Sequence, residues 1–260
     1  MANRYFKGSK LSEGTFRSVV RCFSRDLTAK ETAKKCGVSE RTAAALFRAF
    51  RDRITSHGAP GTPLFDHVQI AIKPLREPGP RGASNKGTSN KTRALVLIQV
   101  GGKVCVDLIP DKSGQSIEPS VLSHVNKRAR IHTNGWPGFA GLKRIGFKNH
   151  SPVKGALPNL APELGSKKAK QDLRAFWLES IKRRKRSFGV PKDKLFSHLR
   201  ESAFKWNHSE DGIYLPLLRI LAANPLVQIY PKRNRIPRRE QPESDSRKAE
   251  ATSFTSSPVT

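Results

Sequence analysis

The stretch from Leu27 to Ile54 constrains the fold more than any other part of this sequence. It reads LTAKETAKKCGVSERTAAALFRAFRDRI, which predicts a short helix, a turn at Gly37 and a second helix rich in arginine. Thr28 is placed to cap the first helix, with Glu31 three residues later as in a capping box, and Ser39 is placed to cap the second. This is the helix-turn-helix pattern, whose second helix enters the DNA major groove.

Apolar and basic side chains share the second helix, as in an amphipathic helix. Its apolar positions are Ala44, Leu46, Phe47 and Phe50, and its arginines are Arg41, Arg48, Arg51 and Arg53. The residues that we expect to contact DNA from this helix are Arg41, Thr42, Arg48 and Arg51. Two residues of the preceding helix, Thr28 and Lys30, are expected to touch phosphate. The alternative interpretation is an ordinary basic helical hairpin.

The charge of the chain points to a polyanionic partner. Its 260 residues hold 49 Lys and Arg against 21 Asp and Glu, a formal net charge of +28. Nucleic acid is the obvious partner for such a chain, and its binding is expected to weaken steeply with salt. An RNA-binding or ribosome-associated protein is the alternative class. No apolar stretch is long enough to span a bilayer, so no membrane partner is expected.

Cysteine usage indicates the compartment. The three cysteines, Cys22, Cys36 and Cys105, form no Cys-x-x-Cys pair, which argues against a zinc site or a disulfide framework. The amino-terminal residues Met1 to Lys10 are polar and basic, unlike a signal peptide. A reducing cytoplasm, with the protein associated with the nucleoid, is therefore expected.

Composition divides the chain into three regions. Residues 1–60 are expected to form the helix-turn-helix module, which includes an additional helix over Lys10–Phe23. A linker rich in Gly and Pro follows at His57–Pro63. Residues 64–226 are expected to form a second domain. Residues 231–260 are polar and poor in apolar side chains, and we expect them to be disordered.

The second domain mixes strands with helices. Strands are expected at His67–Ile72, Ala94–Val100, Lys103–Ile109 and Ala129–Thr133, the middle two joined by a tight turn at Gly101-Gly102. The basic segment Lys73–Arg93, rich in Pro and Gly, is expected to be a mobile loop. Helices are expected at Ser116–Lys127, at Asp172–Lys185, from Val190-Pro191 onward, and at about Gly212–Ala223. The predicted fold class is α/β, an all-helical module followed by a mixed sheet with flanking helices.

Several strings, taken in order, resemble a small bacterial insertion-sequence transposase with a DDE-type catalytic domain. They are YFKGSKLSEGTFRSVVRCFSRDLTAKETAKKCGVS, GGKVCVDLIPDKS, TNGWPGFAGLKRIGFKNH, FWLESIKRR and GVPKDKLFSHLRESAFKWNHSEDGIYLPLLRILAANPL. The resemblance spans roughly residues 4–226. It implies an RNase H-like domain in which acidic side chains bind two Mg²⁺ ions for attack on phosphodiesters.

The three positions that this family uses for metal ligands hold no carboxylate here. The resemblance places the first at Ala71 in HVQIAI, the second at Asn134 before Gly-Trp, and the third at Arg174 before Phe-Trp. Alanine offers no ligand, and an amide oxygen attracts Mg²⁺ less than a carboxylate does. A guanidinium at the third position would repel the ions. An active family member would need Mg²⁺, whereas for this chain we expect no cofactor.

Other side chains offer weaker candidates for chemistry. Acids near these positions are Asp66, Asp107, Asp111 and Asp172, and their spacing does not favour them as substitutes. The scattered histidines, among them His132 and His150, have no metal-ligand spacing. Trp136 is either a core residue or a platform for a frayed base. The run Lys182–Arg186 is either a solvated helix end or, with Arg174 on the same helix, a phosphate-binding surface through Lys182, Arg183 and Arg184.

The sequence thus predicts a transposase-derived protein that binds double-stranded DNA and is catalytically inactive. Its expected target is the terminal inverted repeats of an element or a site descended from them, bound as a homodimer by analogy with the family. The alternative is an active metal-dependent transposase that uses displaced acids. A decayed copy and a repurposed regulator remain equal alternatives.

Overall fold

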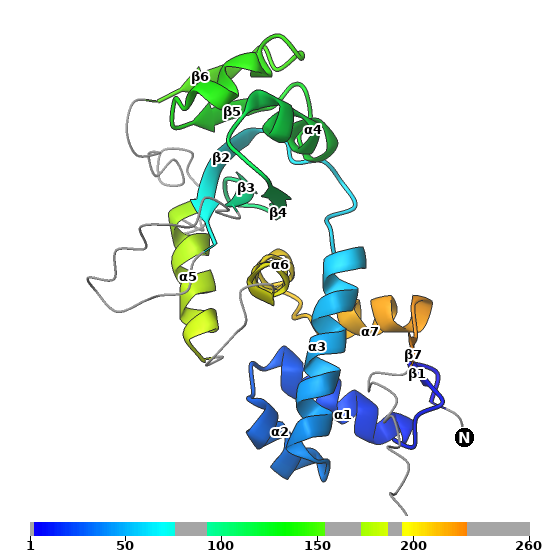
Figure 1. The fold of residues 1–260 in the computed structure, drawn as a ribbon. Helices are drawn as coiled ribbons and strands as arrows, with labels where there is room; N and C mark the ends of the chain where they lie inside the picture. The colour runs from blue at the N-terminus through cyan, green and yellow to red at the C-terminus, as the bar shows by residue number, and fades with distance from the viewer. Residues whose placement is uncertain (1–2, 76–92, 154–172, 187–193, 228–260) are drawn as a thin grey trace, which may run out of the picture. The chain divides into compact units, whose positions relative to one another are not determined.

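The computed structural model describes residues 3–75, 93–153, 173–186 and 194–227. All of them belong to one compact unit, Met1–Ile229 (Figure 1). The predicted tail 231–260, most of the loop 73–93 and the helix start at Val190-Pro191 lie outside the described residues. No helix among those described is both long and apolar enough to cross a membrane.

The amino-terminal residues are helical, with one helix on each side of Gly37 as the sequence predicts. The helices are α1 (Glu13–Ser24), α2 (Ala29–Cys36) and α3 (Glu40–His57). Thr28 and Glu31 form the predicted capping box at the start of α2, and the Ser39 side chain accepts a hydrogen bond from the backbone of Thr42 at the start of α3. Gly37 ends α2 with φ of 64°, a left-handed conformation that glycine adopts without strain.

A five-stranded mixed sheet follows, which confirms the predicted α/β class. Its strands are β2 (His67–Pro74), β3 (Arg93–Gln99), β4 (Val104–Ile109), β5 (Arg130–Thr133) and β6 (His150–Pro152). They lie in the order β4-β3-β2-β5-β6, antiparallel from β4 to β2 and parallel from β2 to β6. Gly101, with φ of 72°, makes the predicted turn between β3 and β4.

Helices cover both faces of this sheet. On one face, α4 (Gly114–His124) and the 3₁₀ helix η1 (Pro137–Leu142) bury Ile117 and Phe139 against Ile70 and Leu97. On the other face, α5 (Leu173–Arg186) and α6 (Leu195–Asn207) pack against Ala71 and Val96. The helix predicted at 116–127 begins earlier because the Ser113 side chain caps it, and it ends earlier because Val125 has an extended backbone conformation.

The core around the helix-turn-helix includes residues from the far end of the chain. Phe16 and Phe50 pack together with Phe204 of α6 and with Leu217 and Leu221 of α7 (Tyr214–Ala223). Short parallel strands β1 (Phe6–Lys7) and β7 (Leu226–Val227) join the two ends of this compact unit. The domain boundary predicted near residue 60 stays a prediction. Residues of α6 and α7, which follow that boundary in sequence, complete the core of the amino-terminal helices.

Candidate nucleic-acid interface

Helix α3 presents two arginines to solvent on one side and buries its apolar residues on the other. Arg41 and Arg48 are exposed, and they are spaced by seven residues, which is about two helical turns. The half-buried Ala44 and Ala45 lie between them, so no large side chain blocks this face. Neither arginine has an acidic partner among the described residues. This strip, Arg41, Ala44, Ala45 and Arg48, is called the α3 face below.

The opposite side of α3 holds the helix in place. Its buried residues are Ala43, Leu46, Phe47, Phe50 and Ile54. Phe23 of α1 meets Phe47 and Phe50 edge-on, with ring centroids 5.1 Å and 5.4 Å apart. Aromatic pairs in this geometry add to the free energy of burial, so α3 is fixed against α1 while the α3 face remains open to solvent.

The capping residues of α2 and α3 are engaged within the protein. The Thr28 hydroxyl donates to the Glu31 carboxylate across 2.8 Å, and the backbone N–H of Thr28 donates to the same carboxylate across 2.7 Å. These bonds, the backbone one first, lower the pKa of Glu31. The Thr42 hydroxyl lies 2.8 Å from that of Ser39. Lys30, in contrast, is exposed on α2.

Two further arginines of α3 turn toward the interior. Arg51 is bound to Glu201 of α6 across 2.6 Å and lies 5.6 Å from the centre of the Phe23 ring. Arg53 donates to the backbone carbonyls of Asn224 and Pro225. The sequence predicted that Arg51 contacts DNA. Such a contact would break the ion pair between Arg51 and Glu201.

The basic residues of α5 likewise include some that are exposed and one that is paired with acids of the protein. Arg174 and Lys182 are exposed. Arg183 lies 3.4 Å from a carboxylate oxygen of Asp26 and 3.6 Å from one of Glu179, so the protein supplies its partners. The side chain of Arg184 lies outside the described residues. The predicted phosphate contacts of α5 remain predictions, with Lys182 and Arg174 as the accessible members.

The three positions that the resemblance assigns to metal ligands lie within β2, directly after β5 and in the first turn of α5. Ile70 of β2 pairs with Thr133, the last residue of β5, so Asn134 directly follows β5 while Ala71 is the next residue within β2. Helix α5 begins beside β2, where the backbone N–H of Leu173 donates to the Gln69 side chain across 3.2 Å. Arg174 is the next residue of α5. Ala71 is only 5% exposed and packs in an apolar cluster with Leu173 and Phe176.

None of the described acids considered as substitutes lies beside Ala71. Asp66 is exposed and precedes β2. Asp107 lies opposite Leu95 of β3, on the α4 side of the sheet, and accepts hydrogen bonds from Ser120 and His124. Asp111 accepts hydrogen bonds from the side chain and backbone of Ser113, which lower its pKa to about 2.

Asp172 lies outside the described residues. Within the part of the chain that the structure describes, no three His, Cys, Asp or Glu side chains are grouped so as to hold a metal ion. Trp136 is 41% exposed, with the Lys112 amine 3.8 Å from the centre of its ring, so it lies at the surface and not in the core.

Three histidines hydrogen-bond within the sheet, His67 and His132 with one another and His150 with Thr133. The Nδ1 atom of His67 lies 3.0 Å from Nε2 of His132, and the two rings are stacked. Burial, followed by the charges of His67 and Arg130, lowers the pKa of His132. His150 hydrogen-bonds to the Thr133 hydroxyl across 2.9 Å. These contacts link β2, β5 and β6.

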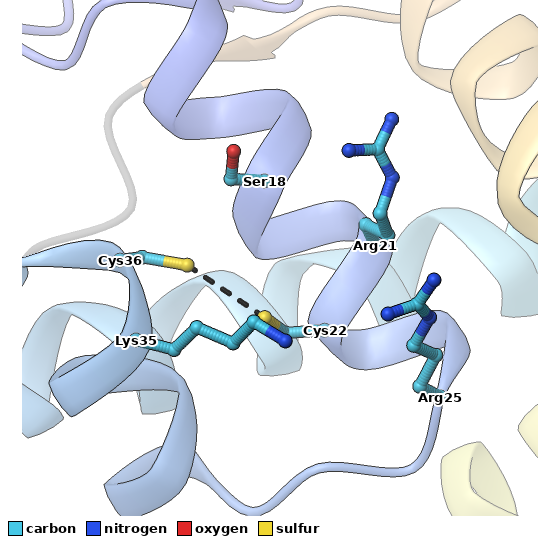
Figure 2. Close-up of a pocket in the computed structure, with 6 residues that line it drawn as sticks. All are labelled: Ser18, Arg21, Cys22, Arg25, Lys35 and Cys36. Atoms are coloured by element: carbon cyan, nitrogen blue, oxygen red, sulfur yellow. Dashed lines mark hydrogen bonds between the residues drawn. The ribbon is translucent and has the colours of Figure 1, made fainter.

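A hollow lies between α1 and α2, at residues that belong to none of the predicted sites. It is lined by Ser18, Arg21, Cys22, Arg25, Lys35 and Cys36 (Figure 2). Arg21, Arg25 and Lys35 are exposed. The helical spacing of Ser18, Arg21 and Arg25 is the signal in the sequence that places them on one side of α1.

Comparisons with known proteins give weak likenesses only. No protein-family model matches the chain, and no curated protein matches it. The chain is similar to an intasome of simian T-cell lymphotropic virus in complex with a PP2A regulatory subunit, at 12% identity and a TM-score of 0.33 over 58% of this chain. It spans about half, 51%, of the length of that viral chain.

Two complexes of Mos1 are also similar to the chain. Its likeness to the Mos1 strand transfer complex has 12% identity and a TM-score of 0.23, and covers 84% of this chain and 80% of that one. Its likeness to a pre-cleavage Mos1 transpososome has 12% identity and a TM-score of 0.22, and covers 78% and 77%. Likenesses at this level assign the chain neither an activity nor a ligand.

Proposed function

We propose that this protein binds double-stranded DNA and that α3 is its recognition helix. The α3 face carries the proposal: Arg41 and Arg48 are exposed, two helical turns apart, and have no acidic partner among the described residues. Alanines between them let the helix backbone approach the floor of a major groove, where guanidinium groups pair with guanine edges or phosphates. The net charge of +28 adds attraction that does not depend on DNA sequence.

Substitution of the two arginines tests this proposal. We expect Arg41→Ala and Arg48→Ala each to weaken binding to the preferred duplex by about 1–3 kcal/mol if they read bases, or to lower the salt slope by about one if they bind phosphate. Arg219→Ala, on the exposed side of α7, is the matched control and should bind as the parent does. Equal effects of all three substitutions would indicate attraction by net charge alone and contradict the role of α3.

The RNA-binding alternative is tested with the same protein. At physiological salt, duplex DNA should be preferred over structured RNA of the same length. A preference for the RNA would overturn the assignment, because the deep and narrow major groove of A-form RNA does not admit a helix.

We propose further that the chain descends from an insertion-sequence transposase and has lost catalysis. The resemblance of its sequence strings suggests the descent, and an RNase H-like domain, terminal inverted repeats as targets, a homodimer and a nucleoid location belong to the same proposal. Supporting the loss, position 71 is packed in an apolar cluster, Asn134 is neutral and Arg174 is cationic. Together these residues offer Mg²⁺ no anionic oxygen.

A strand-cleavage assay tests the loss of activity. The full chain is incubated with duplexes that end in candidate inverted repeats, with and without Mg²⁺ or Mn²⁺. We expect no cleavage above background with either ion. The alternative is an active transposase with displaced acidic ligands. It would be favoured by a metal-dependent cleavage activity that copurifies with the protein and is absent from the Arg41→Ala variant.

A further inference from the structure

The two cysteines of the helix-turn-helix face each other across the hollow between α1 and α2. The sulfur atoms of Cys22 and Cys36 are 3.7 Å apart, and Figure 2 shows them pointing toward one another from different helices. A disulfide bond has an S–S length of about 2 Å. To form one, the two sulfur atoms would have to approach each other by roughly 1.7 Å. Cys22 lies in the last turn of α1, and Cys36 is the last residue of α2.

The hollow gives reagents a route to this pair. It has a volume of about 250 Å³, and both thiols line it. Cys22 is buried, whereas Cys36 is partly exposed. A reagent in the hollow therefore meets Cys36 first, and Cys22 then lies within reach of the product.

Three cations surround the same hollow. Arg21 and Arg25 come from the end of α1, and Lys35 comes from α2 beside Cys36 (Figure 2). Positive charge at a thiol attracts anionic reagents and favours the thiolate. Glutathione disulfide is a net anion at neutral pH, because its carboxylates outnumber its ammonium groups.

We propose that Cys22 and Cys36 form an oxidation site, at which an anionic low-molecular-weight disulfide converts the two thiols into an intramolecular disulfide that joins α1 to α2. The Cys36 thiolate attacks one sulfur of the reagent, forms a mixed disulfide and releases one reagent thiol. Cys22 then attacks the Cys36 sulfur and releases the second reagent thiol. Two protein S–H bonds are lost, one S–S bond is gained, the reagent is reduced to two thiols, and these take up the two protons.

The rate of the first step is set by the fraction of thiolate at Cys36. Burial, followed by the hydrogen bond with the Cys22 thiol, raises the pKa of Cys36 to about 11. Oxidation is therefore slow near neutral pH and accelerates as pH rises toward that value. The site does not depend on the DNA-binding proposal, because it needs only the two thiols and the hollow.

Thiol counting on the reduced full chain tests the proposal. The protein is incubated with glutathione disulfide, quenched in acid, unfolded, alkylated and examined by mass spectrometry. We expect the loss of two of the three thiols, a peptide linking Cys22 to Cys36, and an alkylated Cys105, which is buried in a separate cluster on β4. Cys105→Ser should oxidise as the parent does. A persistent glutathione adduct on Cys36, a link between chains, or retention of all three thiols would each overturn the proposal.

A charge variant tests the role of the cations. Lys35→Gln removes a charge that favours the Cys36 thiolate and should slow oxidation by either reagent. At low salt the slowing should be about threefold greater with glutathione disulfide than with the neutral 2-hydroxyethyl disulfide, because only the anionic reagent also loses the attraction of Lys35. Arg219→Gln, at an exposed position of α7 that does not line the hollow, is the matched control for net charge and should leave both rates unchanged. An equal rate for the parent and Lys35→Gln with glutathione disulfide would contradict the selection of an anionic reagent.

Discussion

Arg51 of α3 donates to the Glu201 carboxylate of α6 across 2.6 Å. Glu201 also lies 2.9 Å from the Lys205 amine, and Lys205 in turn pairs with Asp26 in the turn between α1 and α2. The side chains of Glu201 and Lys205 are 8% and 5% exposed. This buried network fixes the helix-turn-helix to α6, and the orientation of the α3 face depends on it.

Removal of the central charge should destabilise the protein. Glu201→Gln removes the only carboxylate that pairs with Arg51 among the described residues and leaves Lys205 with Asp26 alone. Loss of one partner from a buried ion pair costs about 3 kcal/mol or more. Urea unfolding measures the loss as a lower midpoint at an unchanged slope. Asp211→Asn, which removes an exposed carboxylate, is the control and should change stability by less than about 0.5 kcal/mol. A similar midpoint for both variants would show that the network contributes little.

The same carboxylate predicts a response to acid. Burial disfavours the charged form of Glu201, but Lys205 and Arg51 outweigh this effect and lower its pKa to about 2. A group with a lowered pKa stabilises the fold above its unfolded-state pKa of 4.5 and loses that contribution as pH falls toward 2. The thermal unfolding midpoint of the parent should therefore fall more steeply between pH 4.5 and pH 2 than the midpoint of Glu201→Gln. Parallel curves would contradict the lowered pKa.

The turn of the helix-turn-helix predicts a backbone effect. Gly37 has φ of 64°, and a Cβ placed there would meet no heavy atom within 4 Å, so the only cost of a side chain is conformational. Gly37→Ala should destabilise by about 1–2 kcal/mol. Gly61→Ala is the matched control, because that position is equally open and has no positive φ, and it should be neutral or slightly stabilising. Equal stabilities of the two variants in urea would argue against the left-handed turn.

Local signals explain why α2 and α3 were predictable. Thr28, Gly37 and Ser39 start and stop helices through hydrogen bonds and backbone preferences that span three or four residues. The pairing of β1 with β7 carries no such signal, because each strand has two residues and its partner lies at the other end of the compact unit. Strand β6 has only three residues and ends at Pro152, so it is also too short to show the alternating pattern that predicts a strand.

The candidate interface was predictable only in part for the same reason. Arg41, Arg48 and Arg51 look alike in a sequence, since all three lie on one amphipathic helix. What separates Arg51 is Glu201, which lies 150 residues further along the chain. Likewise, nothing near Arg183 in sequence indicates its pairing with Asp26.

A second titrating pair predicts a response to alkali. The His124 ring on α4 donates to the Asp107 carboxylate on β4 across 2.9 Å. This bond, followed by one with Cys105, raises the pKa of His124 to about 10. A group with a raised pKa stabilises the fold fully below its unfolded-state pKa of 6.5, and that contribution is lost as pH rises through 10.

Comparison with a variant isolates that effect from the other groups that titrate in alkali. The thermal midpoint of the parent should fall more between pH 6 and 10.5 than that of His124→Gln, and the two curves should converge at the alkaline end. A constant difference between them over this range would mean that His124 is neutral in the fold.

Restoring a carboxylate at position 71 tests whether any metal site remains. Ala71 is buried among apolar side chains of β2, α5 and α6, so Ala71→Asp places an acid where nothing pairs with it and should destabilise by about 2–4 kcal/mol. Asn134→Asp, at the exposed end of β5, is the control and should change stability by less than about 0.5 kcal/mol. The double variant Ala71→Asp/Asn134→Asp keeps Arg174, and Leu173 and Phe176 pack in the cluster around position 71. Mg²⁺ should therefore not raise the thermal midpoint of this double variant above its value in buffer free of divalent ions. A rise that saturates with Mg²⁺ would reveal a binding site at positions 71 and 134 and overturn the proposal that the chain has lost its metal centre.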